Sequence, residues 1–407
     1  MKFTLRTKSK SLKGNIILPA SKSISNRVLI IQALTKTPFN INNLSTADDT
    51  VIMQKALDRN DMITDVGPAG TAMRFLTAYY AGQPGEKVLT GSERMKQRPI
   101  SILVDALRSL GARITYLENE GFPPLHIEGR RLNGGHVKVA GNVSSQFITA
   151  LLLIAPTLPQ PLHIDIEGDP LSRPYIGMTK SLMESCGAQL SFEGNQIVVQ
   201  PGRYRSKAYT VEQDWSSAAF WMSFATLARK VNFTLLGLTE NSIQGDRAAT
   251  AIFEKLGLKF QFNETGLGIT KSEEIQDSTE WNFRNHPDLV QPAVISAGAQ
   301  GLKFSFHGLD NLRLKESDRI FALQSELKKA GIESEVNDHT LTLVGNKPAT
   351  ECEEFDAHSD HRMVMSVAAL SMIYPVIKIH DPMVVAKSYP EFWKEVEKFV
   401  DVRPNRS

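Results

Sequence analysis

The stretch that decides the fold is "SSQFITALLLIA", residues 144–155, in which a polar start runs into an almost wholly apolar helix. A helix that is apolar on every side must be buried inside a protein core. Further segments share this design, at residues 21–34, 70–81, 216–228, 288–299 and 360–372. The last five of the six segments begin at residues 70, 144, 216, 288 and 360, which are 74, 72, 72 and 72 residues apart. This regular spacing predicts an internal repeat.

A second kind of helical segment alternates with the first and is amphipathic. Its members are "ISILVDALRSLGA", "YIGMTKSLMESCGA", "RAATAIFEKLGL" and "SDRIFALQSELKKAGI". Each contains, near its end, a glycine suited to a helix C-terminus. Hairpin patterns follow, such as "AQLSFEGNQIVVQ" and "IESEVNDHTLTLVG". The repeating unit is therefore predicted as strand–helix–strand–helix–hairpin, about six times over.

These patterns predict an α/β fold of two similar domains, because 407 residues exceed what one ordinary core holds. Each domain is expected to contain three βαβαββ repeats around buried parallel helices, an arrangement like an inverse α/β barrel. The polar N-termini of these helices would meet at one face of each domain. Two such faces would form an interdomain cleft rich in anion-binding helix ends, and we expect the active site there.

Composition narrows the class of protein. The net charge of +2 argues against binding of nucleic acid or membrane surfaces through bulk positive charge. Two cysteines cannot form a disulfide framework, and no Cys/His group has zinc spacing, so we expect no metal. The N-terminus lacks the apolar core of a signal peptide, and the longest apolar run, "ITALLLIAP", is too short to span a bilayer. A cytoplasmic protein is predicted.

The first inner helix shows what the polar starts can do. Ser21 is placed as an N-cap, and Lys22 follows in the first turn, where a cation opposes the helix dipole. A bound anion would relieve that conflict. The alternative is a capped surface helix with solvated charges. That alternative does not explain why cations recur at the same phase of the repeat.

The motifs taken together resemble those of the 5-enolpyruvylshikimate-3-phosphate synthase family. They are "SKSISNR", "AGTAMR", "LTGSERMKQRPI", "VSSQF", "SRPYI", "LRLKESDR", "DHRMVMS" and "AKSYPEFW", in the family's order and across nearly the whole chain. The resemblance implies two domains of three repeats, with the chain crossing near Ala20 and Val211. The first domain would be residues 20–211, which mainly bind shikimate 3-phosphate, and the second residues 1–19 plus 212–407.

The resemblance also implies a reaction, without metal or organic cofactor. The carboxyvinyl group of phosphoenolpyruvate is transferred to the 5-hydroxyl of shikimate 3-phosphate, and phosphate is released, on the pathway to chorismate and aromatic amino acids. The partners would be these two small molecules and neither nucleic acid nor membrane, and the protein would be a monomer.

Site residues carry over position by position. The residues implied for shikimate 3-phosphate are Lys22, Ser23, Arg27, Ser144, Ser145, Gln146, Ser172, Tyr175, Asp288, Asn311 and Lys315. Those implied for phosphoenolpyruvate are Lys22, Gly70, Arg98, Gln146, Arg319, Arg362 and Lys387. The implied catalytic set is Asp288, Glu316, Lys315 and Lys22, with His361 and Thr71 as supporting residues. Glu316 would protonate the methylene carbon, and Asp288, assisted by Lys315, would take the hydroxyl proton.

Two departures from the family pattern lie near Gly70. Pro68 stands where many relatives have Asn, and Phe75 stands where some have Pro. In the family the herbicide glyphosate, which is longer than phosphoenolpyruvate, occupies this pocket, so the departures bear on inhibitor sensitivity. Gly70 itself is interpreted as allowing close approach of an anion, or alternatively as satisfying a positive φ.

Two rival functions remain at this stage. One is an enolpyruvyl transferase acting on UDP-N-acetylglucosamine, which usually carries a reactive Cys shortly before the arginine that matches Arg98. Here the loop "LTGSERMKQRP" has no Cys, and Cys186 lies in an amphipathic segment. The other is a non-catalytic or RNA-end-binding relative of the same fold. That function would need aromatic stacking residues among the basic ones, where this chain has acids and serines.

Overall fold

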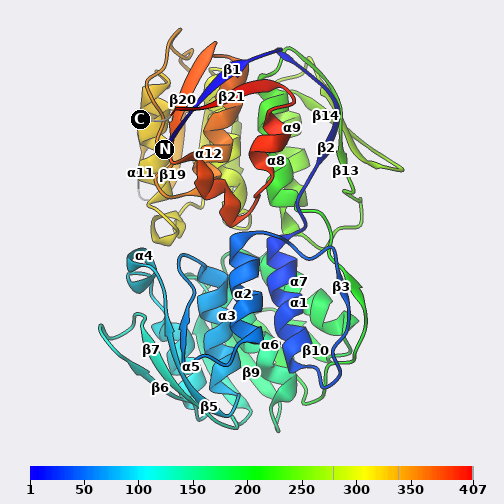
Figure 1. Ribbon diagram of the computed structural model, residues 1–407, viewed down its shortest axis with the longest axis vertical. Helices are drawn as coiled ribbons and strands as arrows, with labels where there is room; N and C mark the ends of the chain where they lie inside the picture. The colour runs from blue at the N-terminus through cyan, green and yellow to red at the C-terminus, as the bar shows by residue number, and fades with distance from the viewer. Residues whose placement is uncertain (278, 338, 406–407) are drawn as a thin grey trace. The chain divides into compact units, whose positions relative to one another are not determined.

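The computed structural model describes residues 1–277, 279–337 and 339–405, and the chain folds as two compact units (Figure 1). Residues 20–211 form one unit, which we call the continuous unit. Residues 1–19 and 212–407 form the other, which we call the discontinuous unit because its N-terminal strands precede the whole of the continuous unit in the chain.

Each unit has three inner helices. In the continuous unit they are α1 (Lys22–Leu34), α3 (Gly70–Ala81) and α6 (Ser145–Ile154). In the discontinuous unit they are α8 (Trp215–Leu227), α10 (Val290–Ala299) and α12 (His361–Ala368). Every residue of α8, α10 and α12 is buried, and α10 packs against both α8 and α12. The prediction of buried helices is confirmed for these three, whereas α1 is buried from Ile24 to Ile31 and more exposed at its two ends.

The remaining helices are partly exposed. They are α2 (Asp48–Asp58), α4 (Glu93–Lys96), α5 (Ser101–Ser109), α7 (Arg173–Ser185), α9 (Ala249–Lys255), α11 (Arg319–Lys329) and α13 (Phe392–Val396). The glycines that follow α5, α7, α9 and α11 all have positive φ, between 66° and 97°, as expected where an L-residue with a Cβ would be strained. Within the described part of the chain, no helix has both the length and the apolar character needed to cross a membrane.

Short 3-10 helices complete the helical elements. They are η1 (Ala155–Thr157), η2 (Gly245–Ala248), η3 (Pro287–Leu289), η4 (Leu312–Leu314), η5 (Ala369–Met372) and η6 (Pro382–Lys387). Three of them, η3, η4 and η6, contain or adjoin predicted site residues. The predicted inner helix at residue 288 therefore begins as η3, and α10 itself begins at Val290.

Four sheets repeat one topology, in which a parallel pair of strands is followed by an antiparallel hairpin. In the continuous unit, one sheet has the strand order β4 (Ile63–Asp65), β5 (Gly85–Thr90), β7 (Leu125–Gly129), β6 (Arg113–Tyr116). The other has the order β8 (Gly135–Ala140), β9 (Leu162–Glu167), β11 (Gln196–Val199), β10 (Leu190–Glu193). In the discontinuous unit, one sheet has the strand order β2 (Ser11–Ile17), β13 (Lys230–Leu236), β15 (Gly266–Lys271), β14 (Leu258–Asn263). The other has the order β16 (Thr279–Asn282), β17 (Lys303–His307), β19 (Thr340–Val344), β18 (Ser334–Val336). Both quoted hairpin predictions are confirmed for the described residues; residue 338 lies outside them.

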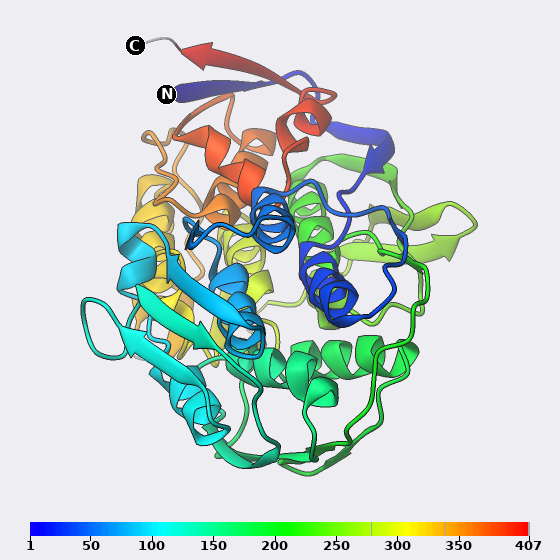
Figure 2. The ribbon, with the colours of Figure 1, turned by 60° about the horizontal axis from the view of Figure 1, so that its bottom comes forward.

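Two repeats depart from this pattern. In the discontinuous unit β20 (Val376–His380) pairs with β1 (Lys2–Thr7), which pairs in turn with β21 (Val400–Asn405), so both chain ends share one sheet (Figure 2). In the continuous unit the first repeat has only β3 (Ile41–Asn42), which pairs with β12 (Tyr209–Thr210). The N-terminal strand thus completes a repeat whose other elements lie at the C-terminus.

Candidate active site

The start of α1 places Lys22 in an ion pair. The Ser21 hydroxyl caps the helix by accepting from the Ile24 amide at 3.4 Å, as predicted. Lys22 Nζ lies 2.9 Å from Asp49 Oδ2 on α2, and these two side chains are 13% and 3% exposed. The unfavourable position of Lys22 at a helix N-terminus is therefore already offset by Asp49, which sequence reasoning missed. The partly exposed ammonium retains hydrogen atoms for a further acceptor.

Arg27 joins α1 to α7. Its Nε donates to Thr179 Oγ1 at 2.8 Å, and two further nitrogens donate to the carbonyls of Ser23 at 2.8 Å and Tyr175 at 3.4 Å. Burial lowers the pKa of Arg27 to about 10, although Tyr175 acts in the opposite direction, so the guanidinium stays charged at neutral pH. The structure brings Arg27, Ser23 and Tyr175 together.

At the start of α3 the guanidinium of Arg98 lies directly over Gly70. A Cβ placed on Gly70 would be 2.6 Å from Arg98 Nη1 and 2.9 Å from Nη2. Gly70 is the first residue of the helix and its φ is not positive, so the alternative interpretation of this glycine is wrong. The absent side chain instead lets a guanidinium and a helix N-terminus approach each other closely, as binding of one small anion by both would require.

Arg74 holds the loop that carries Arg98. Its guanidinium donates to Met95 Sδ at 3.1 Å and to the Pro99 carbonyl at 3.0 Å. Met95 and Pro99 lie on either side of Arg98 in the sequence, so this buried arginine sets the position of the loop on both sides of it. The motif "AGTAMR" contained Arg74, but its role depends on a loop more than twenty residues away.

The starts of α6 and α7 carry the predicted hydroxyl groups. Ser144 caps α6 by accepting from the Gln146 amide at 3.3 Å, and Ser145 is the first residue of that helix. Gln146 Nε2 donates to Thr71 Oγ1 at 3.3 Å, which joins α6 to α3. Ser172 precedes α7 with φ 57° and is buried, an uncommon backbone conformation for a residue with a Cβ.

In the discontinuous unit, Arg319 contacts three carboxylates at once. Its Nε donates to Asp360 Oδ2 at 2.7 Å, Nη1 to Asp288 Oδ1 at 3.2 Å and Nη2 to Glu316 Oε2 at 3.0 Å. Burial would lower the pKa of Arg319, but the three carboxylates raise it above its usual value. A permanently charged, fully buried guanidinium thus organises the predicted catalytic acids.

Asp288 is held between two arginines. Arg362 Nη2 donates to Asp288 Oδ2 at 2.7 Å and Nη1 donates to the Asp288 carbonyl at 3.1 Å, while Arg319 binds the other carboxylate oxygen. Burial tends to raise the pKa of Asp288, but Arg362, Arg319 and Lys315 lower it well below its usual range. Asp288 is therefore ionised at neutral pH and has no proton to donate.

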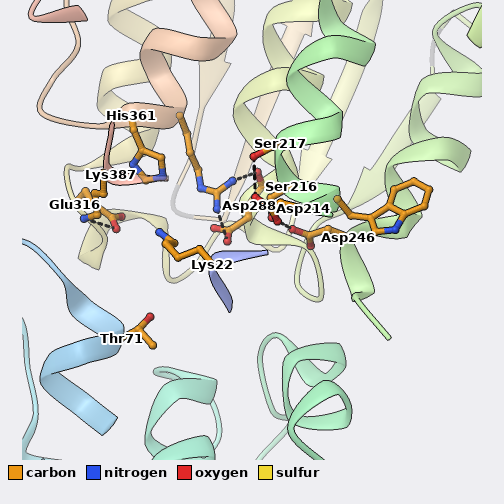
Figure 3. A network of polar contacts seen from close by, with 12 residues as sticks. Lys22, Thr71, Asp214, Ser216, Ser217, Asp246, Asp288, Glu316, His361 and Lys387 are labelled. Carbon is orange, nitrogen blue, oxygen red and sulfur yellow. Dashed lines mark hydrogen bonds and ion pairs between the residues drawn. The ribbon is translucent and has the colours of Figure 1, made fainter. Parts of the chain in front are cut away.

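Glu316 bridges a second pair of cations. Its Oε1 lies 3.1 Å from Lys387 Nζ, and its Oε2 accepts from Arg319, as the dashed contacts in Figure 3 show for Lys387. The side chain of Glu316 is 14% exposed and that of Lys387 8%, so the pair is largely withdrawn from water. Asn311 and Lys315 flank η4 next to Glu316, and Asn311 is buried whereas Lys315 is half-buried.

His361 is almost completely buried, at 1% exposure, with Nδ1 3.6 Å from Asp360 Oδ1. Asp360 is the N-cap of α12 and accepts from the Arg362 amide at 2.9 Å while its other oxygen binds Arg319. Asp360 was not among the predicted site residues. Its position directly before "HR" at a helix start is the signal that would have identified it.

The start of α8, like that of α12, carries carboxylates of the chain. Ser217 Oγ donates to Asp214 Oδ2 at 2.7 Å, and Ser216 donates to Asp246 (Figure 3). Both acids are buried. Carboxylates of the chain itself thus supply negative charge at this helix N-terminus, where negative charge is favoured.

The two cysteines have the properties of packed thiols. Cys186 is buried at the C-terminus of α7, and burial raises the pKa of its thiol. Burial also raises the pKa of Cys352, to about 11. In the described ranges no group of three or more His, Cys, Asp and Glu side chains is placed to hold a metal ion.

These features can be compared with those of known proteins. Residues 6–59 and 54–396 match the model of the family described as EPSP synthase (3-phosphoshikimate 1-carboxyvinyltransferase). The chain belongs to the EPSP synthase family. The match spans nearly the whole chain, and it confirms the resemblance inferred from the eight motifs.

Individual members of the EPSP synthase family are similar to this chain over nearly its full length. The chain is 45% identical, over 98% of each sequence, to the 3-phosphoshikimate 1-carboxyvinyltransferase of Bacteroides fragilis strain YCH46. It is 34% identical to that of Haemophilus influenzae strain KW20, over 95% of this chain and 96% of the relative. The EPSP synthase structure of Acinetobacter baumannii aligns with a TM-score of 0.78 at 21% identity, covering 99% of this chain and all of that one. The predicted α/β two-domain fold class is confirmed.

Proposed function

We propose that this chain transfers the carboxyvinyl group of phosphoenolpyruvate to the 5-hydroxyl of shikimate 3-phosphate and releases phosphate. The observation that carries the proposal is the buried Arg319, whose contacts gather Asp288 and Glu316, both predicted for proton transfer. Two carboxylates in a shared network of cations suit a reaction that moves two protons between different atoms.

The anion-binding groups suit the two substrates, each of which carries a phosphate and a carboxylate. In the continuous unit we assign Ser23 and Arg27 to the carboxylate of shikimate 3-phosphate. We assign Ser144, Ser145 and Ser172 of the same unit to its phosphate. Gln146 and Tyr175, together with Asn311 of the discontinuous unit, are assigned to its ring.

For phosphoenolpyruvate, we assign Lys22, Arg98 and Lys387 to the phosphate, with Gly70 at its backbone. Arg319 and Arg362 are assigned to the carboxylate, because a planar guanidinium suits a bidentate contact. Both arginines are bound to Asp288 in the structure, so we expect the substrate carboxylate to share the guanidinium donors with Asp288.

The proton transfers follow from these positions. Asp288, assisted by Lys315, takes the proton of the 5-hydroxyl as the hydroxyl oxygen adds to C2 of phosphoenolpyruvate. Glu316 gives a proton to the C3 methylene of phosphoenolpyruvate. Phosphate then leaves as the bond from C2 to its oxygen breaks, and it takes the proton held by Asp288. The C3 methyl returns a proton to the Glu316 carboxylate, which restores the double bond and leaves both acids as they began. Positive charge that develops at C2 is stabilised by the carboxylates of Glu316 and Asp288.

The sister activity on UDP-N-acetylglucosamine is not favoured, because both thiols have raised pKa values and neither lies in the Arg98 loop. The test is phosphate release from phosphoenolpyruvate with either acceptor, after calorimetric titration with shikimate 3-phosphate. Turnover with shikimate 3-phosphate and none with UDP-N-acetylglucosamine is expected. The opposite preference, or no phosphate release with either acceptor, would contradict the proposal.

We further propose that the protein works in the cytoplasm as a monomer, on small-molecule substrates of aromatic amino acid biosynthesis and without a cofactor. The relatives above are enzymes of that reaction by name, which supports the assignment of the substrates. Light scattering during gel filtration tests the oligomeric state.

A further inference from the structure

The segment that leads into α12 contains a strained turn. Phe355 is tied to β20 by hydrogen bonds from its amide to the Lys378 carbonyl and from the His380 amide to its own carbonyl, both at 2.9 Å. The Asp360 amide then donates to the Ala357 carbonyl at 2.8 Å, which closes a turn over His358 and Ser359. Both central residues have positive φ, 49° and 55°.

Such a turn normally uses Gly or Asn, because residues with a larger side chain are strained at positive φ. His358 and Ser359 are two consecutive residues in this strained conformation, so other contacts must stabilise the turn. The structure provides them through one buried carboxylate, that of Glu326 on α11, which is 0% exposed.

Glu326 binds this segment at two points. Its Oε1 lies 2.6 Å from His358 Nε2, and its Oε2 accepts from the Asp356 amide at 2.9 Å. Lys329 Nζ lies within 2.8 and 3.1 Å of the two oxygens and offsets the buried charge. An ionised carboxylate only accepts hydrogen bonds, so the His358 nitrogen that faces it carries the hydrogen.

The same helix also binds the residue that follows the turn. Glu326 lies seven residues, or about two turns, after Arg319, so both project from one face of α11. Arg319 binds Asp360 at 2.7 Å, and Glu326 binds His358 at 2.6 Å. Helix α11 therefore holds the start of α12 at two places, one on each side of Ser359.

We propose that Glu326 and His358 are a positioning pair, which holds the turn so that Asp360 and Arg362 meet Arg319 and Asp288 in the observed geometry. Neither residue is placed against a substrate. The inference rests on the proposed function in that the arginines it positions are those assigned to the carboxylate of phosphoenolpyruvate. Loss of the pair is therefore expected to weaken phosphoenolpyruvate binding selectively.

The test uses a substitution that suits the turn but cannot reach Glu326. Asn tolerates positive φ, yet its side chain is too short to replace the His358 Nε2 contact, so His358→Asn should fold. We expect the KM for phosphoenolpyruvate to rise about tenfold or more, and the KM for shikimate 3-phosphate to change less than about twofold. His358→Gln places an amide donor near the Nε2 position, so its KM for phosphoenolpyruvate should lie close to that of the parent protein. Glu326→Gln, which removes the charge, should reproduce the effect of His358→Asn.

Two control variants separate positioning from general stability. Ser359→Gly relieves the adjacent positive φ without touching Glu326, and should leave both KM values unchanged. His380→Asn removes a histidine–carboxylate contact of 2.7 Å to Glu354 in the same unit, and should also leave them unchanged. Equal falls in activity with all substrates, in step with the melting temperature, would show a purely structural role and overturn the proposal.

A readout without turnover distinguishes failure of this proposal from failure of the proposed function. In protein labelled with ¹⁵N-arginine, the Nε–H signal of Arg319, assigned with Arg319→Lys, reports its bond to Asp360. The signal should move in His358→Asn and Glu326→Gln but not in His380→Asn. If the parent protein released no phosphate while the signal moved, the function would fail and the positioning pair would stand. If the parent protein turned over normally, and His358→Asn and Glu326→Gln each left the signal and the KM for phosphoenolpyruvate unchanged, the proposal of a positioning pair would be wrong.

Discussion

A single methyl group added at Gly70 tests the candidate phosphoenolpyruvate site. In Gly70→Ala the new Cβ would lie 2.6, 2.9 and 3.0 Å from the Nη1, Nη2 and Cζ atoms of Arg98. Ordinary contact requires 3.4 to 4 Å, so the guanidinium must retreat by about 1 Å. The displaced group is the end of a flexible side chain and not backbone, so the substitution should move Arg98 and leave the fold intact.

The magnitude follows from what Arg98 is proposed to do. A displaced guanidinium loses a charge-assisted hydrogen bond to the substrate phosphate, which is worth about 1.5–3 kcal/mol. The KM for phosphoenolpyruvate should therefore rise about ten- to hundredfold. Glyphosate, the longer inhibitor, should be weakened further than phosphoenolpyruvate because it has less room to adjust. The KM for shikimate 3-phosphate, assigned to Ser23, Arg27, Ser144 and Ser145, should not change.

The assay is steady-state turnover with and without glyphosate, together with a thermal melt of the same protein. Gly70 has helical backbone, where Ala is favoured over Gly by up to ~1 kcal/mol, so the melting temperature should not fall. Gly82→Ala at the other end of α3 is the matched control, since its Cβ would meet nothing closer than 3.7 Å. A lower melting temperature with an unchanged ratio of glyphosate to phosphoenolpyruvate affinity would refute the reasoning.

Three further predictions concern the carboxylates around Arg319. Glu316→Gln should lower turnover about a hundredfold or more with little change in affinity for shikimate 3-phosphate, measured by calorimetry; turnover close to that of the parent would remove Glu316 from the proton transfer. Asp360→Asn should lower the melting temperature and raise the KM for phosphoenolpyruvate, because the buried Arg319 loses a charged partner; no change in either would contradict its structural role. The arginines lower the pKa of Asp288, so its contribution to stability is present above an unfolded pKa of about 3.9 and is lost as the pH falls further. Melting temperatures measured from pH 7 to 3 should therefore fall less steeply below about pH 4 for Asp288→Asn than for the parent; parallel curves would contradict this.

Several features of the fold could be predicted because they depend on short stretches of chain. The apolar helices, the Ser21 and Ser144 caps and the glycines after the amphipathic helices follow from side chains within one or two turns of each other. The family could be predicted for a related reason, because each motif is a short run of neighbouring residues that can be recognised in the sequence alone. None of these predictions requires knowledge of which distant segments meet.

The partners of the charged groups could not be predicted in the same way. Lys22 pairs with Asp49, Arg319 with Asp360 and Arg362 with Asp288, across 27, 41 and 74 residues of sequence. A pattern search finds an arginine at a helix start but does not find the carboxylate that another helix brings to it. Sequence reasoning therefore assigned Arg319 and Arg362 to a substrate carboxylate and missed that both already bind acids of the chain.

The sequence by itself determined the repeat, the buried helices and the family, and it supplied the residues that we propose for anion binding and proton transfer. Tertiary structure alone decided that β1 completes a sheet with the C-terminal strands, that Arg98 lies over Gly70 and that Glu326 contacts His358. The physical reason is range. Helix periodicity, capping and turn preferences act between residues a few positions apart, whereas these contacts join segments that approach only when the helices and sheets of a unit pack together.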